Sequence, residues 1–159
     1  MVQRRESGII ISNGLCWSPD SRHMYFADSP LRSMYVYDFD ANDGSIANRR
    51  VFARTPEGAH PDGATVDAEG YVWSAHWGAG QVVRYRPDGL VDRTLPVPAS
   101  QPTCVAFGGP DLDLLFVTSA RENLSEQALA SQPDAGNVFI YKMDVKGLPD
   151  RRYTGADGA

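Results

Sequence analysis

The amino-acid sequence predicts an all-β fold, a β-propeller of four-stranded antiparallel blades, and three observations support this prediction. Short apolar runs rich in Val, Tyr and Phe are separated by 15 glycines and 11 prolines, a composition typical of strands and turns. The same succession of strands and turns occurs three times. The copies begin at Asn13, Asp62 and Thr103, 49 and then 41 residues apart, close to the roughly 40–50 residues of one blade.

The strands are expected in the same order within each copy. The first strand starts at or beside the residue that opens the copy, and a turn follows it. Second strands are predicted at residues 24–27, 71–75 and 114–118. Third strands, whose side chains alternate in character as in a half-buried strand, are predicted at 34–40, 81–86 and 137–144. Fourth strands are predicted at 49–53 and 91–95, with a weaker one near Arg152.

One short helix is the exception to this pattern. Residues 122–131 (ENLSEQALAS) have helical composition, and Pro133 and Gly136 close the segment off. We therefore expect a short helix within a long loop.

The three copies predict one domain, with blades at roughly 8–55, 56–98 and 99–155. A β-sandwich also uses many short strands, but it has no reason to repeat the same four-strand succession three times. Propellers close with about four to eight blades, and closure removes exposed sheet edges. Three blades make an arc with two open ends, so the chain is interpreted as the second half of a propeller.

Charge and composition argue against several classes of partner. The net charge is −5 and no run of Lys or Arg is present, so we expect neither nucleic acid nor an acidic membrane as a partner. The apolar run Ile9–Ile11 is too short for a signal sequence or a membrane span. Cys16 and Cys104 form no CxxC motif and are expected to be buried free thiols. A cytoplasmic protein is the resulting expectation.

The residue that opens each copy is the candidate site residue. Loops that lead into the inner strands of a propeller surround one mouth of its channel, so Asn13, Asp62 and Thr103 should face the same axis. Amide, carboxylate and hydroxyl oxygens suit Ca²⁺, Mg²⁺ or Mn²⁺, and no His/Cys spacing indicates zinc. An alternative stays open, because Asn-Gly and Asp-Gly are also common turn dipeptides.

The ordered motifs of the chain resemble the senescence-marker-protein/gluconolactonase/luciferin-regenerating-enzyme family, also called regucalcin-like. The resemblance covers nearly the whole chain. The motifs that carry it are ISNGLCWSPD (11–20), YFADS (25–29), PDG (61–63), DAEG (67–70), GAGQVVRY (78–85), QPTCVAFGG (101–109) and GNVF (136–139).

This resemblance implies half of a six-bladed propeller that holds one divalent cation in the channel mouth and opens sugar lactones. Asn13 and Asp62 match the metal-binding Asn and Asp of the family, and Asp62 also matches its usual general base. Calcium is the cation we expect, with Zn²⁺, Mn²⁺ or Mg²⁺ as alternatives. The third protein ligand, a Glu in the first blade, has no counterpart here, nor have the Arg and Asn that contact the substrate.

Further side chains are assigned weaker roles. His60, His76 and Trp77 flank the inner strands and are substrate-binding candidates, with Trp77 able to stack on a sugar ring. Ordinary packing is the competing interpretation for each of them. Thr103 occupies the ligand register but has no ligand counterpart in the family, so we expect it to line the channel, where it is a further weak substrate-binding candidate. Four other aspartates are expected in structural roles: Asp20, Asp28, Asp67 and Asp88.

Three functional hypotheses follow. In the first, the chain is a metal-dependent hydrolase of sugar lactones, in which the cation polarises the carbonyl and Asp62 takes a proton from water. In the second, it is a non-catalytic metal-binding or interaction fragment, since two protein ligands with one negative charge should hold a cation weakly. In the third, a homodimer closes the ring and brings two copies of Asn13 and of Asp62 to one axis.

Overall fold

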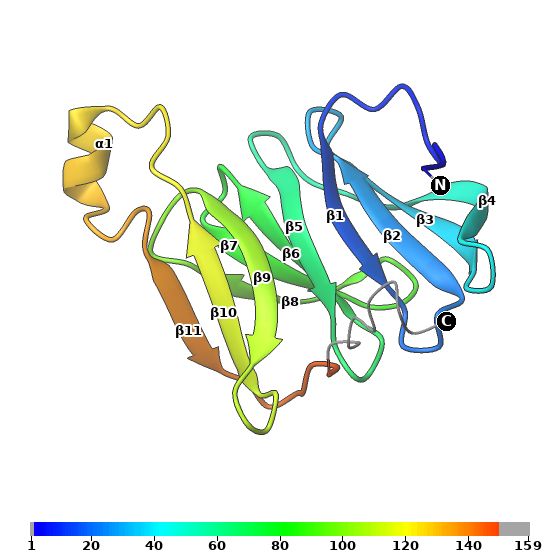
Figure 1. Cartoon of the computed structure of the whole chain (residues 1–159). Coiled ribbons are helices and arrows are strands. Elements are labelled where there is room, and N and C mark those ends of the chain that lie inside the picture. Colours follow the sequence, from blue (N-terminus) through cyan, green and yellow to red (C-terminus); the bar gives the residue numbers. More distant parts are fainter. Residues whose placement is uncertain (1, 150–159) are drawn as a thin grey trace.

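Three antiparallel sheets follow one another along the chain in the computed structural model, which describes residues 2–149 (Figure 1). Sheet 1 contains β1 (Ser12–Trp17), β2 (His23–Asp28), β3 (Ser33–Asp40) and β4 (Ser45–Arg54). Sheet 2 contains β5 (His60–Val66), β6 (Val72–Trp77), β7 (Gln81–Tyr85) and β8 (Val91–Pro96). Sheet 3 contains β9 (Pro102–Gly108), β10 (Leu114–Ser119) and β11 (Val138–Lys142). Strands adjacent in sequence are adjacent in each sheet.

The all-β class is confirmed, and each strand predicted within residues 2–149 is present. Strand β4 starts at Ser45, four residues earlier than predicted, because a tight turn lets pairing begin at once: the Gly44 N–H donates to the Asp40 carbonyl at 2.8 Å. The weak strand predicted near Arg152 lies outside the described residues.

The predicted helix is present but shorter than residues 122–131. Helix α1 (Glu126–Ser131) lies in the connection between β10 and β11. It begins at Glu126 because Ser125 is its N-cap, whose hydroxyl accepts from the Ala128 N–H at 3.2 Å. None of its residues is fully buried, although Leu129 packs against the edge of the core between sheets 2 and 3.

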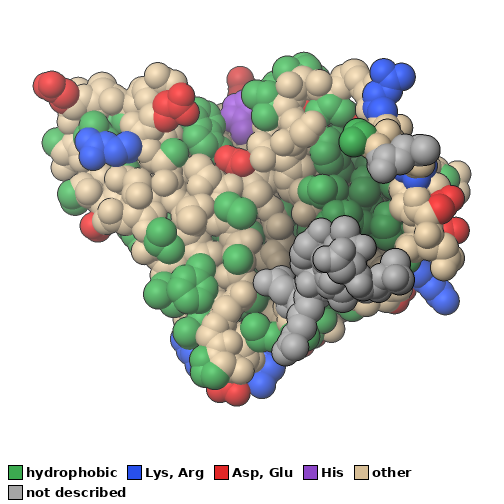
Figure 2. Space-filling view, viewed as in Figure 1, with side chains coloured by type: hydrophobic (Ala, Val, Ile, Leu, Met, Phe, Trp, Pro, Cys, Tyr) green, Lys and Arg blue, Asp and Glu red, His purple; other side chains and the backbone are tan. Residues whose placement is uncertain are grey.

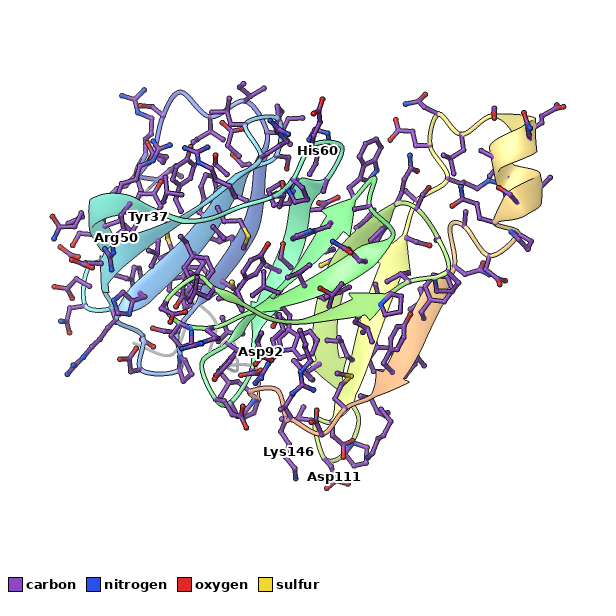
Figure 3. The ribbon with its side chains drawn as sticks, turned by 180° about the vertical axis from the view of Figure 1, so that it is seen from behind. Tyr37, Arg50, His60, Asp92, Asp111 and Lys146 are labelled. Carbon is purple, nitrogen blue, oxygen red and sulfur yellow. The ribbon has the colours of Figure 1, made fainter. Side chains whose placement is uncertain are left out.

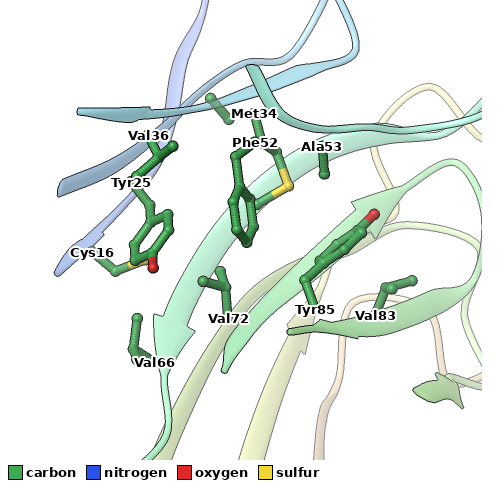
Figure 4. Packing of buried hydrophobic residues seen from close by; sticks show 11 residues of the cluster. Cys16, Tyr25, Met34, Val36, Phe52, Ala53, Val66, Val72, Val83 and Tyr85 are labelled. Atoms are coloured by element: carbon green, nitrogen blue, oxygen red, sulfur yellow. The ribbon is translucent and has the colours of Figure 1, made fainter. Parts of the chain in front are cut away.

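Each sheet packs against the next through alternating side chains. Between sheets 1 and 2 lies the cluster shown in Figure 4, which includes Tyr25, Phe52 and Tyr85. Between sheets 2 and 3 lies a second cluster with Trp73 at 0 % exposure. Neighbouring residues of one strand, such as Val72 and Trp73 of β6, serve opposite clusters because strand side chains point to alternate faces. Sheet 2 is therefore the middle layer of the stack.

The first strands of the three sheets, β1, β5 and β9, contact one another in sequence and follow one another across the middle of Figure 1. Two glycines permit this approach. A Cβ on Gly14 would lie 3.2 Å from the Asp62 carbonyl oxygen, and a Cβ on Gly63 would lie 2.8 Å from the Cα of Cys104. The glycines are thus required where one first strand meets the next.

Replacing Gly63 by alanine is expected to lower the free energy of unfolding by about 1–3 kcal/mol, the usual cost of overpacking, because the new Cβ meets backbone that cannot rotate away. Gly63 has no positive φ, so the loss would be steric. Urea unfolding of G63A and of G58A checks this. Gly58 has open space around it but a φ of +77°, so G58A should show only the backbone penalty of about 1 kcal/mol. An unchanged midpoint for G63A would contradict the close packing of β5 on β9.

A partly buried ion-pair network centred on Arg84 of β7 joins strands β7 and β8 to the turn after β5 in sheet 2. Arg84, 2 % exposed, donates from Nε to the carboxylate of Asp67, which is 0 % exposed, at 2.8 Å. Its other nitrogens donate to Glu69 at 2.7 Å and to Asp92 at 2.9 Å. Asp67 also accepts from the indole Nε1 of Trp73 at 2.9 Å. The structural role expected for Asp67 is thus consistent with its contacts.

Asp28 has a comparable role at the start of sheet 1. Its two carboxylate oxygens accept from the backbone N–H groups of Ile10 and Ile11 at 3.1 and 3.2 Å. The carboxylate is 0 % exposed and anchors the segment that leads into β1. Asp28 therefore sets the direction from which the chain approaches Asn13.

The two cysteines are free, but only one is buried. Burial raises the pKa of the Cys16 thiol to about 12. The expectation that Cys104 is also buried is wrong. Cys104 pairs with Thr118, and Thr118 with Val138, in one row across sheet 3; all three residues are exposed because no further described sheet covers this face.

No helix among residues 2–149 is long and apolar enough to cross a membrane.

Candidate functional site

The three residues that open the sequence repeats all lie at irregularities in strand pairing. The register of β1 with β2 shifts between Asn13 and Cys16, and that of β5 with β6 shifts between Pro61 and Ala64, a stretch that contains Asp62. The register of β9 with β10 shifts around Thr103. A bulge redirects a side chain away from the regular alternation of a strand. The Asn-Gly and Asp-Gly pairs therefore lie inside bulged strands and not in hairpin turns.

Asp62 is a half-buried carboxylate that has no counter-ion among residues 2–149. Burial raises its pKa, and a hydrogen bond from the Gly63 N–H partly offsets this effect. Within residues 2–149 no Lys, Arg or His nitrogen lies at ion-pair distance from it. A desolvated carboxylate with no cationic neighbour suits a site for a bound cation.

Asn13 is joined to the strand of Asp62 through Ser29. The Asn13 Nδ2 donates to the Ser29 hydroxyl at 2.9 Å, and that hydroxyl donates to the Pro61 carbonyl at 2.6 Å. The amide oxygen of Asn13 makes no hydrogen bond within the described part of the chain. One amide oxygen and one carboxylate, both hard donors, are thus held on adjacent first strands.

Thr103 belongs to sheet 3 and does not share this linkage. Its hydroxyl lies 2.7 Å from the hydroxyl of Thr118 on the neighbouring strand β10. The structure therefore places Thr103 in the register of Asn13 and Asp62 while its hydrogen bond runs within its own sheet.

His60 and Trp77 face each other across the β5–β6 pair beside the site. Their rings meet edge to face with centroids 5.8 Å apart, and both residues are partly exposed. The Nδ1 of His60 lies 3.0 Å from the Ser29 carbonyl oxygen. A carbonyl can only accept, so Nδ1 carries the proton and a neutral ring presents Nε2 as an acceptor. Figure 3 shows His60 near one end of the molecule and Lys146 and Asp111 at the opposite end.

His76 lies apart from this pair, in the interior of the molecule. It is 1 % exposed, and its Nε2 is 3.1 Å from the Tyr85 hydroxyl. Its Nδ1 has no partner within the described residues. Burial lowers the pKa of His76 to about 4, so the ring is neutral at physiological pH. The structure thus brings Asn13 and His60 together at Ser29 and stacks Trp77 edge-on against His60. Asp62 follows Pro61, which accepts from Ser29, and His76 is buried in the interior.

The donor set is small for a metal centre. Within residues 2–149 there is no group of three or more His, Cys, Asp or Glu side chains that could hold a metal ion. Asn13 and Asp62 supply two hard oxygens and one negative charge, which fits part of a calcium coordination sphere. Ser29, to which the sequence analysis assigned no role, joins Asn13 to the strand of Asp62; its sequence signal is its place as the last residue of the YFADS motif (25–29).

A large hollow lies apart from these residues. A hollow of about 750 Å³ follows the three first strands beyond the site and is lined by side chains including Trp17, Val66 and Phe107. Figure 2 shows hydrophobic side chains gathered in a hollow over β1 and β2. Asn13, Asp62 and Thr103 do not line this hollow, so it is distinct from the candidate site.

Comparison with known proteins identifies similar sequences along nearly the whole chain. The family model described as the SMP-30/gluconolactonase/LRE-like region matches residues 1–121. An L-arabinolactonase of Azospirillum brasilense is 44 % identical over 146 residues, which are 91 % of this chain and 48 % of that protein. A 6-deoxy-6-sulfogluconolactonase of Pseudomonas putida is 42 % identical and covers 92 % of this chain and 51 % of its own length.

A solved structure has the same arrangement of strands. The calcium-binding protein regucalcin from Agrobacterium tumefaciens superposes with a TM-score of 0.84 at 40 % identity, over 88 % of this chain and 48 % of that one. The chain spans about half the length of the curated relatives it matches.

Proposed function

The chain belongs to the SMP-30/gluconolactonase/LRE-like family, and from this premise we propose that it is the metal-binding part of a hydrolase that opens sugar lactones. The observation that carries the proposal is the half-buried Asp62 carboxylate, which has no counter-ion within the described residues and follows Pro61, whose carbonyl is linked through the Ser29 hydroxyl to the amide of Asn13. The names of the two lactonase relatives support the substrate class.

The proposed architecture is half of a six-bladed propeller. Sheets 1, 2 and 3 would be the blades at about 8–55, 56–98 and 99–155, with β1, β5 and β9 as the strands beside the channel. Three features support this: the contacts of the first strands, the stacking of the sheets, and relatives about twice as long. The bulged starts of these strands would then surround one mouth of the channel.

Asn13 and Asp62 would hold the cation, for which we propose Ca²⁺ because both donors are hard oxygens; Mn²⁺, Mg²⁺ and Zn²⁺ are the alternatives. The bound cation would supply Lewis acidity to the lactone carbonyl. The carboxylate of Asp62 takes a proton from the attacking water, whose oxygen bonds to the carbonyl carbon. The ring C–O bond then breaks, the ring oxygen takes up a proton, and the hydroxy acid leaves.

The rim residues would bind the sugar. The Nε2 of His60 offers an acceptor to a sugar hydroxyl, and the partly exposed ring of Trp77 offers a face for stacking. Thr103 would line the channel. His76 is the weakest of the proposed contacts, because it is 1 % exposed. A cytoplasmic location stays our prediction.

A second candidate function is metal binding without catalysis. It is favoured by the small donor set, two protein oxygens with one negative charge, and by a calcium-binding relative. In a homodimer that closes the ring, two such sets would meet at one axis and supply four oxygens.

Metal add-back separates these candidates. The chain is first freed of metal with a chelator, and hydrolysis of glucono-δ-lactone and of an arabinonolactone is then followed by acid release with added Ca²⁺, Mn²⁺ or Zn²⁺. Metal-dependent turnover is the expected result. Calorimetric metal binding without turnover would support the non-catalytic candidate, and no binding would overturn both. Light scattering on the same sample reports whether a dimer forms.

A further inference from the structure

We infer that Ser29 is a positioning residue of the candidate metal site, which holds the amide of Asn13 so that its oxygen, not its nitrogen, is presented to the cation. The inference rests on the proposed metal-binding function and extends it. Ser29 lies one residue beyond β2 and is 8 % exposed. Its hydroxyl is hydrogen-bonded to Asn13 and to the Pro61 carbonyl, so its role would be to orient a ligand and not to be one.

The orientation of the Asn13 amide follows from the order of donors in a short chain of hydrogen bonds. The Pro61 carbonyl can only accept, so the Ser29 hydroxyl, 2.6 Å away, must donate its single proton there. That hydroxyl can then only accept from Asn13 at 2.9 Å. The group of Asn13 that faces Ser29 is therefore the donor Nδ2, and Oδ1 points the other way.

This orientation matters because the two ends of an amide have opposite effects on a cation. The oxygen is a hard ligand, whereas the NH₂ group offers no lone pair and repels positive charge. Without a fixed partner the amide can turn by 180° about its last torsion angle, which has two similar minima. Ser29 removes the unproductive orientation before the cation arrives.

Ser29 also ties the strand of Asn13 to the strand of Asp62. Its backbone N–H donates to the Ile11 carbonyl at 3.2 Å, within the segment that enters β1. Its hydroxyl and its carbonyl oxygen contact Pro61 and His60, the two residues before Asp62. The serine thus sets the position of both ligand strands, and its loss should weaken metal binding without removing a ligand.

The first test needs no metal. In protein labelled with ¹⁵N-asparagine, the side-chain amide protons of Asn13 should exchange with solvent several-fold faster in Ser29→Ala than in the wild type, with Ser29→Cys between the two because a thiol is a weaker acceptor. Ser119→Ala is the matched control. Ser119 also donates to one carbonyl, that of Asn137 at 2.8 Å, and accepts from one backbone N–H, that of Gly136 at 3.0 Å, but it contacts no candidate ligand.

The second test measures calorimetric Ca²⁺ binding. The Kd should rise about five- to tenfold in Ser29→Ala, which corresponds to one ordinary hydrogen bond, and should stay unchanged in Ser119→Ala. Unchanged amide exchange in both Ser29 variants would overturn the inference whatever the metal does. A wild type that binds Ca²⁺ while Ser29→Ala binds it equally well would also overturn it. A wild type that binds no metal defeats the proposed function alone, and the amide exchange then decides whether Ser29 orients Asn13.

Discussion

Replacing Asp62 by asparagine is expected to lower metal-dependent lactone hydrolysis by at least about a hundredfold, the effect usually seen when a general base is removed. Asparagine keeps the size of the side chain and one oxygen, but it removes both the negative charge that would hold the cation and the basicity needed to take a proton from water. Initial rates at saturating metal and lactone, together with calorimetric metal binding, measure the two losses separately.

Asp88→Asn is the matched control for Asp62→Asn. Asp88 lies in an exposed turn, where its carboxylate accepts from the Leu90 N–H at 3.1 Å and pairs with Arg86 at the surface. Its replacement should leave turnover unchanged. Full activity in Asp62→Asn would exclude Asp62 as both ligand and base.

The pH dependence of the wild type follows from the direction in which the pKa of Asp62 is shifted. Burial raises this pKa above its ordinary value, so the base is lost by protonation at a higher pH than for an exposed aspartate. Turnover should therefore fall as the pH is lowered through the raised pKa. Because metal and proton compete for one carboxylate, a higher metal concentration should move the fall in turnover to lower pH.

The burial of Asp62 also implies that Asp62→Asn does not lower the melting temperature at neutral pH without metal, since it removes a poorly solvated charge.

Replacing Asp67 by alanine, unlike Asp62→Asn, is expected to destabilise the fold, with a loss of about 3–5 kcal/mol in the free energy of unfolding. Asp67 is 0 % exposed and shares a 2.6 Å ion pair with Arg84, whose side chain is 3 % exposed. Without the carboxylate, the guanidinium, the indole N–H of Trp73 and two backbone N–H groups lose an acceptor in the interior. Urea unfolding followed by tryptophan fluorescence measures the effect.

Asp92→Ala is the control for Asp67→Ala, because Asp92 binds the same guanidinium from the surface side. Its side chain is 27 % exposed, so we expect a loss of no more than about 1 kcal/mol. Equal losses for the two variants would show that burial of the pair is not what makes Asp67 important. Asp62 lies near the start of β5 and Asp67 follows its last residue; the first is expected to serve binding and the second stability.

The strands could be predicted because their signals are local. Strand positions follow from alternating apolar residues, from turn residues, and from the same order of strands and turns occurring three times. All of these features can be read from the sequence without tertiary contacts. Asn13 and Asp62 were found for the same reason, since both hold the first position of a repeat. The structure places them in bulged strands, tied together through Ser29.

The sequence by itself determined the all-β class, the order of the strands, the family and the register of Asn13 with Asp62. Only the tertiary structure decided that Gly63 faces Cys104, that Cys104 is exposed, that His76 is buried and that Ser29 joins Asn13 to Pro61. The physical reason is one of range. A strand depends on the pattern of its own residues. The contact of Asn13 with Ser29 joins residues 16 positions apart, and that of Gly63 with Cys104 joins residues 41 positions apart. Such contacts exist only once the bulges and the stacking of the sheets have set the distance between the strands.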